Sequence, residues 1–229
     1  MNDIHTQLLT QVKNYKMPTL AAGLLNQQPP LIISAVTASG KNTVADHIIN
    51  STSYRETVSH TTRPPRPSEI NGEHYWFVDE AQMLSKVQAE VFVEVKAIHG
   101  ETVYGTSIES YKNIVARGQR PLLIIDVQGV EEISRGLPKL KPYFLLPPSY
   151  GEWMNRLHSR GIITDQDKAN RITSAKREIA TVLKNPAYIL IVNDQIEATA
   201  NKILSGQTDK TEQTKNRQLA KELLNRLNS

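Results

Sequence analysis

Short apolar runs that alternate with helix-like segments are the feature that most restricts how this chain of 229 residues can fold. The runs typical of buried strands are residues 31–36, 122–125, 143–146 and 188–192. Apolar residues at helical spacing occur at 44–49, 107–117, 131–135, 150–160, 169–183 and 195–204. Strands that alternate with helices indicate βαβ units, so we predict an α/β domain with a parallel sheet flanked by helices.

The composition excludes several classes of protein. The chain has no cysteine, which rules out disulfide frameworks, zinc sites built on thiolates and cysteine nucleophiles. No apolar run approaches the ~20 residues of a membrane span, and the N-terminus lacks the apolar segment of a secretory signal. We therefore expect a cytoplasmic protein that does not act at a membrane. The net charge of +4 suits an anionic small ligand and is too weak to indicate nucleic acid.

The two ends of the chain differ from its middle. Residues 1–30 form a predicted N-terminal helical extension, in which Leu8 and Val12 share a face. Residues 206–229 are predicted to be a linker and a C-terminal helix, and the polar stretch 205–215 is interpreted as that linker. The apolar stripes of both ends can pack on the parent domain, bind a partner or pair two subunits into a dimer. Packing on the parent domain is the default expectation.

The middle of the chain, residues 31–205, is predicted to be one domain that carries an insert. Residues 56–105 have few helical signals and alternate on a period of two, for example at Tyr75 and Phe77. Such alternation is typical of strands with one buried face. We therefore expect a small antiparallel insert at about residues 56–106.

The segment after the first predicted strand matches a phosphate-binding loop. Residues 35–43, AVTASGKNT, place Gly40 and Lys41 at the diagnostic positions of the G-x-x-x-x-G-K-[ST] motif, between a strand and a helix. Backbone N–H groups at a helix N-terminus converge there on phosphate oxygens, and the lysine neutralises charge. Ala35 replaces the first glycine and Asn42 replaces the hydroxyl residue, so an ordinary Ser-Gly turn is the alternative. The candidate phosphate-binding residues are Ala38, Ser39, Gly40, Lys41, Asn42 and Thr43.

A segment rich in proline and arginine follows at residues 59–67, SHTTRPPRP. Its prolines favour an extended or polyproline II backbone with ~3 residues per turn, which places Arg63 and Arg66 on the same side. Two guanidinium groups on one rigid face make a phosphate clamp. The alternative is a solvated loop or a ligand for a proline-binding module.

Five blocks of the chain carry a family pattern in a single order: residues 59–69 with Gly72, Tyr75 and Phe77; 104–107; 126–129; 156–161 with Arg171; and 192–194. In these blocks the chain resembles the guanylate kinase family over about residues 31–205. The resemblance implies a P-loop NTPase-type parallel sheet, a GMP-binding insert and a helical lid at about residues 156–171. It also implies that ATP and GMP are the substrates, that Mg²⁺ accompanies ATP, and that the γ-phosphoryl group passes to GMP.

The same resemblance implies a role for individual residues in binding GMP. Guanine presents adjacent N–H donors, for which the carboxylate of Glu94 is the natural acceptor. The hydroxyl groups of Ser59 and Thr106 would also reach the base. The remaining residues implied at the GMP site are Arg63, Arg66, Tyr75 and Tyr104 for the phosphate, Glu69 to orient an arginine, and Asp126.

Three arginines are the candidates for stabilising the transferring phosphoryl group. Arg156 and Arg160 are four residues apart and would share a helix face, and Arg171 begins the next helical stretch. Mobile arginines can stabilise the charge that spreads over phosphoryl oxygens. The alternative for this pattern alone is two solvated helix faces. With Lys41, these arginines are the predicted catalytic residues.

Three positions depart from the family pattern. Asn42 stands in place of Ser or Thr, Ile124 stands where the first carboxylate of an Asp-x-Asp pair is usual, and one extra residue separates Glu94 from Tyr104 at 99–103 and can re-aim that tyrosine. Mg²⁺ would lie near Asn42, Thr43 and Asp126, held largely through water. Because Mg²⁺ keeps several waters and binds substrate phosphates, the loss of one protein oxygen need not abolish its binding. We therefore expect activity, at a full or a reduced level. The alternatives are a GMP-binding or interaction module with weak or no turnover, and a kinase for another phosphorylated small molecule.

Overall fold

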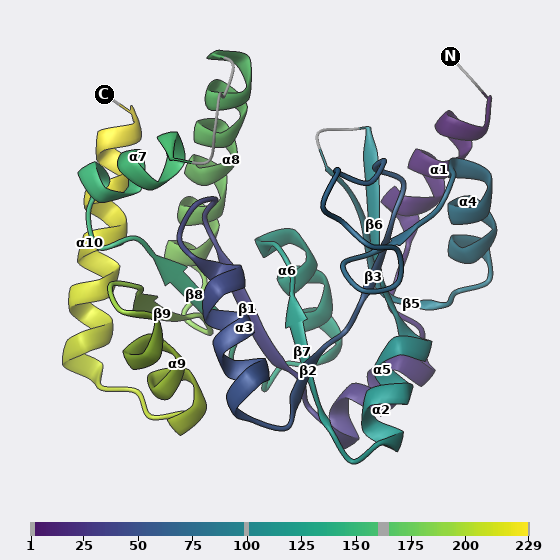
Figure 1. Ribbon diagram of the computed structural model, residues 1–229, viewed down its shortest axis with the longest axis horizontal. Coiled ribbons are helices and arrows are strands. Elements are labelled where there is room, and N and C mark those ends of the chain that lie inside the picture. The colour runs from purple at the N-terminus through teal and green to yellow at the C-terminus, as the bar shows by residue number, and fades with distance from the viewer. Residues whose placement is uncertain (1–2, 99–100, 160–164, 229) are drawn as a thin grey trace. The chain divides into compact units, whose positions relative to one another are not determined.

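The computed structural model describes residues 3–98, 101–159 and 165–228 (Figure 1). It confirms the expected α/β fold, with parallel strands flanked by helices and an additional small sheet. The chain forms two compact units. The first contains Met1–Leu31, Ser53–Leu123 and Gln128–Leu140, and the second contains Ile32–Thr52, Ile124–Val127 and Lys141–Ser229. In the described ranges, no helix combines the length and apolar character needed to cross a membrane.

Three parallel strands form the centre of the second unit: β1 (Leu31–Ala35), β8 (Tyr143–Leu146) and β9 (Ile189–Val192). β8 pairs with both neighbours, so that Ile33 lies opposite Tyr143 and Leu145 lies opposite Ile191. Nearly every residue of these strands is buried, as expected for parallel strands covered by helices. The helices of this unit are α3 (Lys41–Ser51), α7 (Tyr150–His158), α8 (Asp165–Lys184), α9 (Ile196–Ser205) and α10 (Lys210–Asn228).

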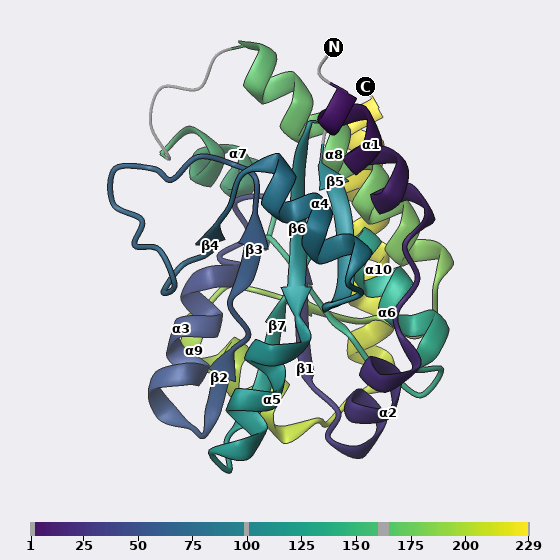
Figure 2. The ribbon, with the colours of Figure 1, turned by 90° about the vertical axis from the view of Figure 1, so that its right-hand side faces the viewer.

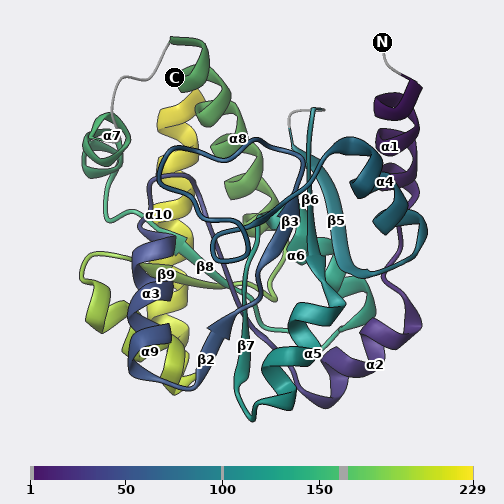
Figure 3. The ribbon, with the colours of Figure 1, turned by 45° about the vertical axis from the view of Figure 1, so that its right-hand side comes forward.

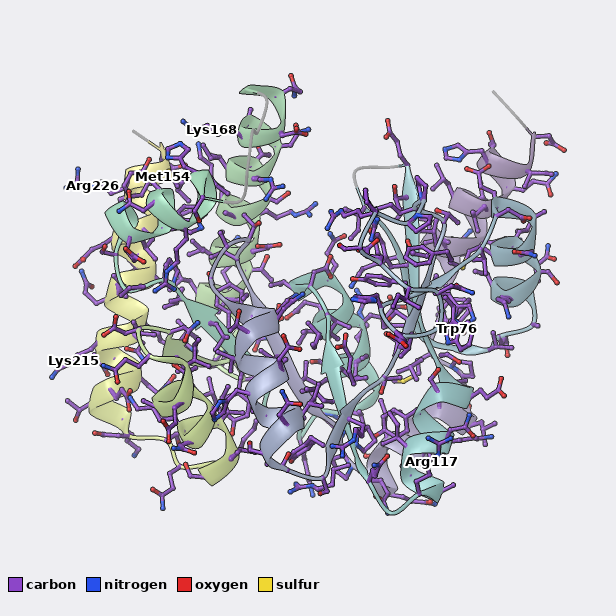
Figure 4. All side chains as sticks on the ribbon, in the orientation of Figure 1. Trp76, Arg117, Met154, Lys168, Lys215 and Arg226 are labelled. Carbon is purple, nitrogen blue, oxygen red and sulfur yellow. The ribbon has the colours of Figure 1, made fainter. Side chains whose placement is uncertain are left out.

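The C-terminal helix α10 lies beside β9, the edge strand of its sheet (Figure 3). Its polar side chains bond to that strand. The Gln213 side chain donates to the carbonyl of Leu190 and accepts from its N–H, both at 3.0 Å, and Asn216 donates to the same carbonyl at 2.7 Å. These bonds satisfy backbone groups that a further strand would otherwise pair. On the opposite side of α10, Lys215 and Arg226 point outward (Figure 4).

The interpretation of residues 205–215 as a linker is wrong for most of that stretch. Only residues 206–209 lie between helices, because α10 already begins at Lys210. Its polar residues include good helix formers, and Gln213 is used to bond the neighbouring strand. A polar composition therefore indicated exposure here without indicating loss of structure.

The first unit contains a parallel pair, β2 (Tyr54–Glu56) with β7 (Arg120–Ile124), and a separate four-stranded sheet (Figure 2). The order in that sheet is β4 (Trp76–Phe77), β3 (Ser59–Thr61), β6 (Thr102–Ser107) and β5 (Phe92–Ile98). The helices of this unit are α1 (Asp3–Asn14), α2 (Thr19–Gln27), α4 (Glu80–Gln88), α5 (Ile108–Ala116) and α6 (Val127–Gly136), the last of which begins at the boundary between the units.

The predicted insert is present, but its sheet is mixed instead of wholly antiparallel. β6 pairs antiparallel with β3 and β5, whereas β4 pairs parallel with β3. A parallel pairing needs a long connection, and residues 62–75 provide it. The short edge strand β4 also carries Trp76, whose side chain is partly exposed (Figure 4).

Helix α4 lies inside the segment where sequence reasoning saw few helical signals. Its start has a capping box, in which Asp79 accepts from the Gln82 N–H and Gln82 accepts from the Asp79 N–H. Met83, Leu84 and Val87 are buried on one side of this helix. The capping pattern Asp-x-x-Gln before this apolar spacing was the signal that could have predicted the helix.

The N-terminal extension is part of the hydrophobic core of the first unit. Leu8 and Val12 of α1 are buried in one cluster with Met83 of α4 and Phe92 of β5. The hydroxyl group of Tyr15 donates to the Phe92 carbonyl at 2.7 Å and accepts from the Phe92 N–H at 3.1 Å. Burial raises the pKa of Tyr15 to about 12, so the hydroxyl keeps the proton that it donates. The apolar stripe of α1 thus packs against its own chain.

Candidate active site

The phosphate loop of the second unit joins the end of β1 to the start of α3. Gly40 is the residue before the helix and adopts a left-handed conformation with φ of +81°. No side chain caps this helix N-terminus, so its backbone N–H groups are available to an anion. A Cβ at position 40 would lie 2.5 Å from Nδ2 of Asn193, and this close approach also requires glycine. Ala38 is left-handed as well, with φ of +62°.

Two side chains distant in sequence hold this loop in place. Asn193, which follows β9, donates from Nδ2 to the Ser39 carbonyl at 2.7 Å. Trp153 of α7 is fully buried and donates from Nε1 to the Thr37 carbonyl at 2.7 Å. Sequence reasoning noted Asn193 only as part of a family block and missed Trp153, for which no local pattern gave a signal. The buried Ser39 Oγ and Asn193 Oδ1 have no hydrogen-bond partner in the described part of the chain.

A cavity of about 290 Å³ lies beside the loop within the second unit. Its lining includes Ala38, Gly40 and Thr43 from the loop and the start of α3. Arg156 of α7 and Asn193 also line it. The cavity therefore lies next to the N-terminus of α3, where backbone N–H groups could bind phosphate.

Two of the three predicted lid arginines can be located. Arg156 donates from Nε to Oε1 of Glu152 at 2.8 Å and from Nη1 to the Asn193 carbonyl at 3.0 Å. Arg171 of α8 has its Nη1 3.4 Å from Oγ1 of Thr37, in the loop itself. α7 ends at His158, two residues earlier than predicted, and Arg160 lies outside the described residues.

The other predicted residues of the second unit lie around the start of α3 and the end of β7. Lys41 is the first residue of α3, and Asn42 and Thr43 follow it with exposed side chains. Asp126 comes two residues after Ile124, the last residue of β7. The second unit therefore offers one ammonium group and several hard oxygen donors near the loop sequence.

A cluster of arginine, glutamate and tyrosine side chains stands on the four-stranded sheet of the first unit. Arg63 donates from Nη2 to Oε1 of Glu69 at 2.8 Å and from Nε to the Tyr104 hydroxyl at 3.2 Å. Its guanidinium carbon lies 5.5 Å from the centre of the Tyr75 ring, which itself lies 5.8 Å from that of Tyr104. The hydrogen bond from Arg63 lowers the pKa of Glu69, and the bond to Glu69 raises the pKa of Arg63. Four predicted residues thus meet in one place.

Arg66 belongs to the same cluster but is held less tightly. Its N–H donates to Oε2 of Glu69 at 2.8 Å, and its Nη1 lies 4.0 Å from Oε1. The Arg66 side chain is 70% exposed, against 18% for Arg63. The two arginines predicted as equal members of a clamp therefore differ: Arg63 is fixed in advance, and Arg66 is open to solvent.

A buried carboxylate stands next to this cluster on the same sheet. The Glu94 side chain accepts from the Thr106 hydroxyl at 2.6 Å, and the Thr106 hydroxyl lies 3.4 Å from that of Ser59. The register explains this grouping, because Ser59 and Glu94 pair with Thr106 from its two sides. Three predicted residues from β3, β5 and β6 therefore converge at one point, and Glu94 is almost fully buried there.

Sequence reasoning missed a lysine beside this carboxylate. Nζ of Lys96 lies 3.6 Å from Oε2 of Glu94, and both side chains are buried. The available signal was the spacing: residues 94 and 96 of one strand must project from the same face. Gly129 of α6 faces the pair, since a Cβ there would lie 2.7 Å from Nζ of Lys96.

The extra residue between Glu94 and Tyr104 leaves the strand pairing regular. Glu94 lies opposite Thr106, and the register continues without a shift to Ile98 opposite Thr102. The difference in length therefore falls in the connection between the strands, of which His99 and Gly100 lie outside the described residues. Tyr104 stays in register, with its hydroxyl next to Arg63.

Comparison with known proteins gives a consistent result. The guanylate kinase family model matches residues 27–207. A guanylate kinase of Haemophilus influenzae is 35% identical over 177 residues, which is 76% of this chain and 84% of the relative. A guanylate kinase of Neisseria gonorrhoeae is 37% identical over 175 residues, or 76% and 83% of the two chains. The crystal structure of a guanylate kinase from Anaplasma phagocytophilum aligns with a TM-score of 0.59 at 27% identity, covering 79% of this chain and 88% of that one.

The family match, together with the α/β fold, places the chain among the nucleoside monophosphate kinases. Within that class, the chain belongs to the guanylate kinase family.

Proposed function

We propose that this protein transfers the γ-phosphoryl group of Mg·ATP to GMP, giving ADP and GDP. The observation that carries the proposal is that one strand, β6, contacts both a cluster of arginines and a buried carboxylate. Tyr104 and Thr106 are two residues apart on β6 and so share a face, with their α-carbons about 7 Å apart. Tyr104 contacts the arginine cluster, and Thr106 contacts the buried Glu94. One face thus offers a cation for a phosphate beside an acceptor for a base.

The base is proposed to be guanine because the buried Glu94 carboxylate is a hydrogen-bond acceptor. The Watson–Crick edge of guanine presents N1–H and an N2 amino group side by side, and a carboxylate accepts from both. Glu94 is the buried carboxylate in this position, and Ser59 and Thr106 add hydroxyl groups that either donate or accept. Adenine presents an acceptor at N1, which Glu94 would repel.

The phosphate of GMP is proposed to bind the cluster around Arg63. Arg63 is already oriented by Glu69 and Tyr104, so little conformational entropy is lost when it binds an anion. Arg66 and Tyr75 complete the clamp, Arg66 as the exposed arm that closes on the ligand. Asp126 stays in the proposal on the family resemblance alone, as a further carboxylate for GMP or for the water around magnesium.

ATP is proposed to bind at the N-terminus of α3. The phosphates would accept backbone N–H bonds from residues 38–43, and Lys41 would bind the β- and γ-phosphate oxygens. The adjoining cavity of about 290 Å³ suits the remainder of the nucleotide. Arg156, Arg160 and Arg171 would stabilise the transferring phosphoryl group, of which Arg171 already reaches the loop at Thr37. Positioning and electrostatic stabilisation then supply the catalysis, with no covalent enzyme intermediate.

The residues near the loop are compatible with magnesium. Asn42, Thr43 and Asp126 offer oxygen atoms, the ligand type that Mg²⁺ prefers, and the buried Ser39 Oγ is a polar atom awaiting a partner. Within the described ranges no group of three or more histidine or acidic side chains gathers into a metal cage, so phosphate oxygens and water would supply most ligands. When bound with ATP, the ion would neutralise charge on the β- and γ-phosphates.

A coupled assay of ADP formation tests the proposal across nucleoside monophosphates. Mg·ATP is supplied with GMP, dGMP, IMP, AMP, CMP or UMP, and GMP should be turned over with the highest kcat/KM. Preferred turnover of another monophosphate would transfer the proposal to a different substrate. Tight GMP binding by calorimetry without ADP formation would favour the alternative of a binding module.

A further inference from the structure

Glu94 and Lys96 form a buried pair of opposite charges inside the proposed guanine site. They lie two residues apart on β5, and Nζ of Lys96 is 3.6 Å from Oε2 of Glu94. The side chain of Lys96 is 10% exposed and that of Glu94 is 2% exposed. Oε1 of Glu94 accepts from Thr106, whereas Oε2 has no hydrogen-bond partner in the described part of the chain. The ammonium group therefore lies toward the oxygen that is still open to a donor.

Helix α6 packs against this pair at Gly129, which has no side chain and so leaves space for both groups. A Cβ on Gly129 would lie 2.7 Å from Nζ of Lys96 and 3.0 Å from Oε2 of Glu94, so any larger residue would displace one of the two groups. Glu132 lies one turn further along α6, on the same face. Burial and the negative charge of Glu94 raise the pKa of Glu132 to about 7, and Lys96 acts in the opposite direction. Two carboxyl groups therefore share the influence of one ammonium group.

The other charged and titratable groups around this cluster come from three directions. Arg135 of α6 acts on Glu132, Tyr15 approaches from the N-terminal extension, and Glu90 precedes β5. Among the described residues, Arg135 acts on Glu132, whereas Tyr15 and Glu90 bring no positive charge to Glu94. Lys96 is thus the positive charge that the described contacts bring to the guanine-recognising carboxylate.

We propose that Lys96 is a positioning residue for guanine recognition, which keeps the buried Glu94 carboxylate ionised and oriented so that both oxygens accept. The inference rests on the proposed function. Burial favours the neutral form of a carboxyl group, and a nearby opposite charge favours the ionised form. A neutral Glu94 would carry one hydroxyl, which faces the guanine N–H donors with a donor of its own. Without Lys96, guanine recognition would therefore become sensitive to acid.

The test compares Lys96→Met, Lys96→Arg and the matched control Lys112→Met, which removes a charge from the exposed face of α5 in the same unit. KM for GMP, KM for ATP and kcat are measured from pH 6 to pH 8.5. Lys96→Met should raise KM for GMP about tenfold at pH 7, and by a larger factor at pH 6 than at pH 8.5. Its KM for ATP and its kcat should change less than threefold. Lys96→Arg keeps the charge, so it should retain more of the affinity for GMP than Lys96→Met and show a weaker dependence of KM on pH.

Several outcomes would overturn the inference. An unchanged KM for GMP in Lys96→Met, an equal rise in the KM for ATP, or the same effect from Lys112→Met would each contradict it. Should Lys96→Met fail to fold, Lys96→Gln decides, since it keeps a donor beside Glu94 but lacks the charge and should show the same acid-sensitive KM. Calorimetry with GMP alone, beside the assay of ADP formation, separates the two proposals. If wild type binds GMP but forms no ADP, only the proposed reaction fails, and the GMP affinities of the variants still test the role of Lys96. Wild type that does not bind GMP defeats both.

Discussion

The two proposed substrate sites use different parts of the polypeptide to bind phosphate. In the first unit, the GMP cluster is made of side chains that contact one another, such as Arg63 with Glu69 and Glu94 with Thr106. In the second unit, the phosphate loop presents backbone N–H groups, and the side chains of Asn193 and Trp153 serve to hold that backbone. A site made of backbone tolerates side-chain variation that a site made of side chains does not.

This difference accounts for the departures at Ala35 and Asn42, but not for Ile124 or for the extra residue between Glu94 and Tyr104. Ala35 and Asn42 are changes in or beside the phosphate loop, where the groups proposed to bind phosphate are mostly main-chain atoms. The GMP side keeps every side chain that the family resemblance implies, from Ser59 to Thr106. The predictions below test whether the two sites respond differently to substitution.

The largest effect should come from Lys41, the side chain of the phosphate loop that is proposed to bind the β- and γ-phosphates. Lys41→Ala should lower kcat by roughly 10²–10³, because Lys41 would supply a full charge to the β- and γ-phosphates and its neutral neighbours Gly40 and Asn42 cannot replace it. Asn42→Ser should leave kcat similar or raise it, since residue 42 offers at most one neutral oxygen to an ion that also accepts water. Steady-state ADP formation with GMP measures both. Equal background rates for wild type and both variants would mean that the site is a relic and would support the binding-module alternative.

Within the arginine cluster, the loss of GMP affinity should differ between Arg63→Ala and Arg66→Ala. Arg63→Ala should weaken GMP binding by roughly 10- to 100-fold, because a preoriented charged hydrogen bond is lost and Glu69 is left without its main partner. Arg66→Ala should cost less, because that side chain is 70% exposed. Calorimetry with GMP and with guanosine measures the contrast. If both ligands lose affinity equally, the arginines do not read phosphate and the prolines merely shape a loop.

A smaller effect concerns stability and pH on the GMP side. The pKa of Glu132 is about 7 in the folded protein and near 4.5 when unfolded, so folding is penalised increasingly as pH rises from 4.5 to 7. Glu132→Gln removes that titration. The variant should therefore gain unfolding free energy relative to wild type between pH 5 and pH 8, by about 1–2 kcal/mol at most, because solvent screens this partly exposed side chain. Urea denaturation at the two pH values checks this, and a difference that is independent of pH would show that partial burial and the charge of Glu94 do not raise the pKa of Glu132.

The elements that sequence predicted best are those with a strong local pattern. β1, β8 and β9 are continuous apolar runs, and the structure has them at the predicted places. α4 was missed because its nine residues carry a short apolar spacing within a segment that otherwise alternates. The start of α10 was missed because polar residues predict exposure and not conformation. Local pattern therefore predicts elements that bury a whole face better than elements that are short or largely solvated.

The site residues divide in a similar way. Lys41, Arg63 and Glu94 lie in motifs that a single stretch of sequence displays, and family resemblance supplied their proposed roles. Trp153 and Lys96 lie outside any motif. Trp153 acts through a long-range contact with Thr37, and Lys96 pairs with Glu94 two residues away on the same strand. The contact of Trp153 has no signature in one sequence. The spacing of Lys96 from Glu94 indicates a shared strand face, but it does not show that the two charges meet in a buried site.

Calorimetric titration of GMP into folded Glu94→Gln tests the central claim most directly, namely that a buried carboxylate in the first unit reads guanine. Glutamine has the same size but turns one acceptor into a donor that faces guanine donors, which should cost about 1–3 kcal/mol of binding free energy. The account predicts a fall in GMP affinity of roughly 5- to 150-fold, with the affinity for Mg·ATP unchanged. Unchanged GMP affinity in the folded variant would contradict it.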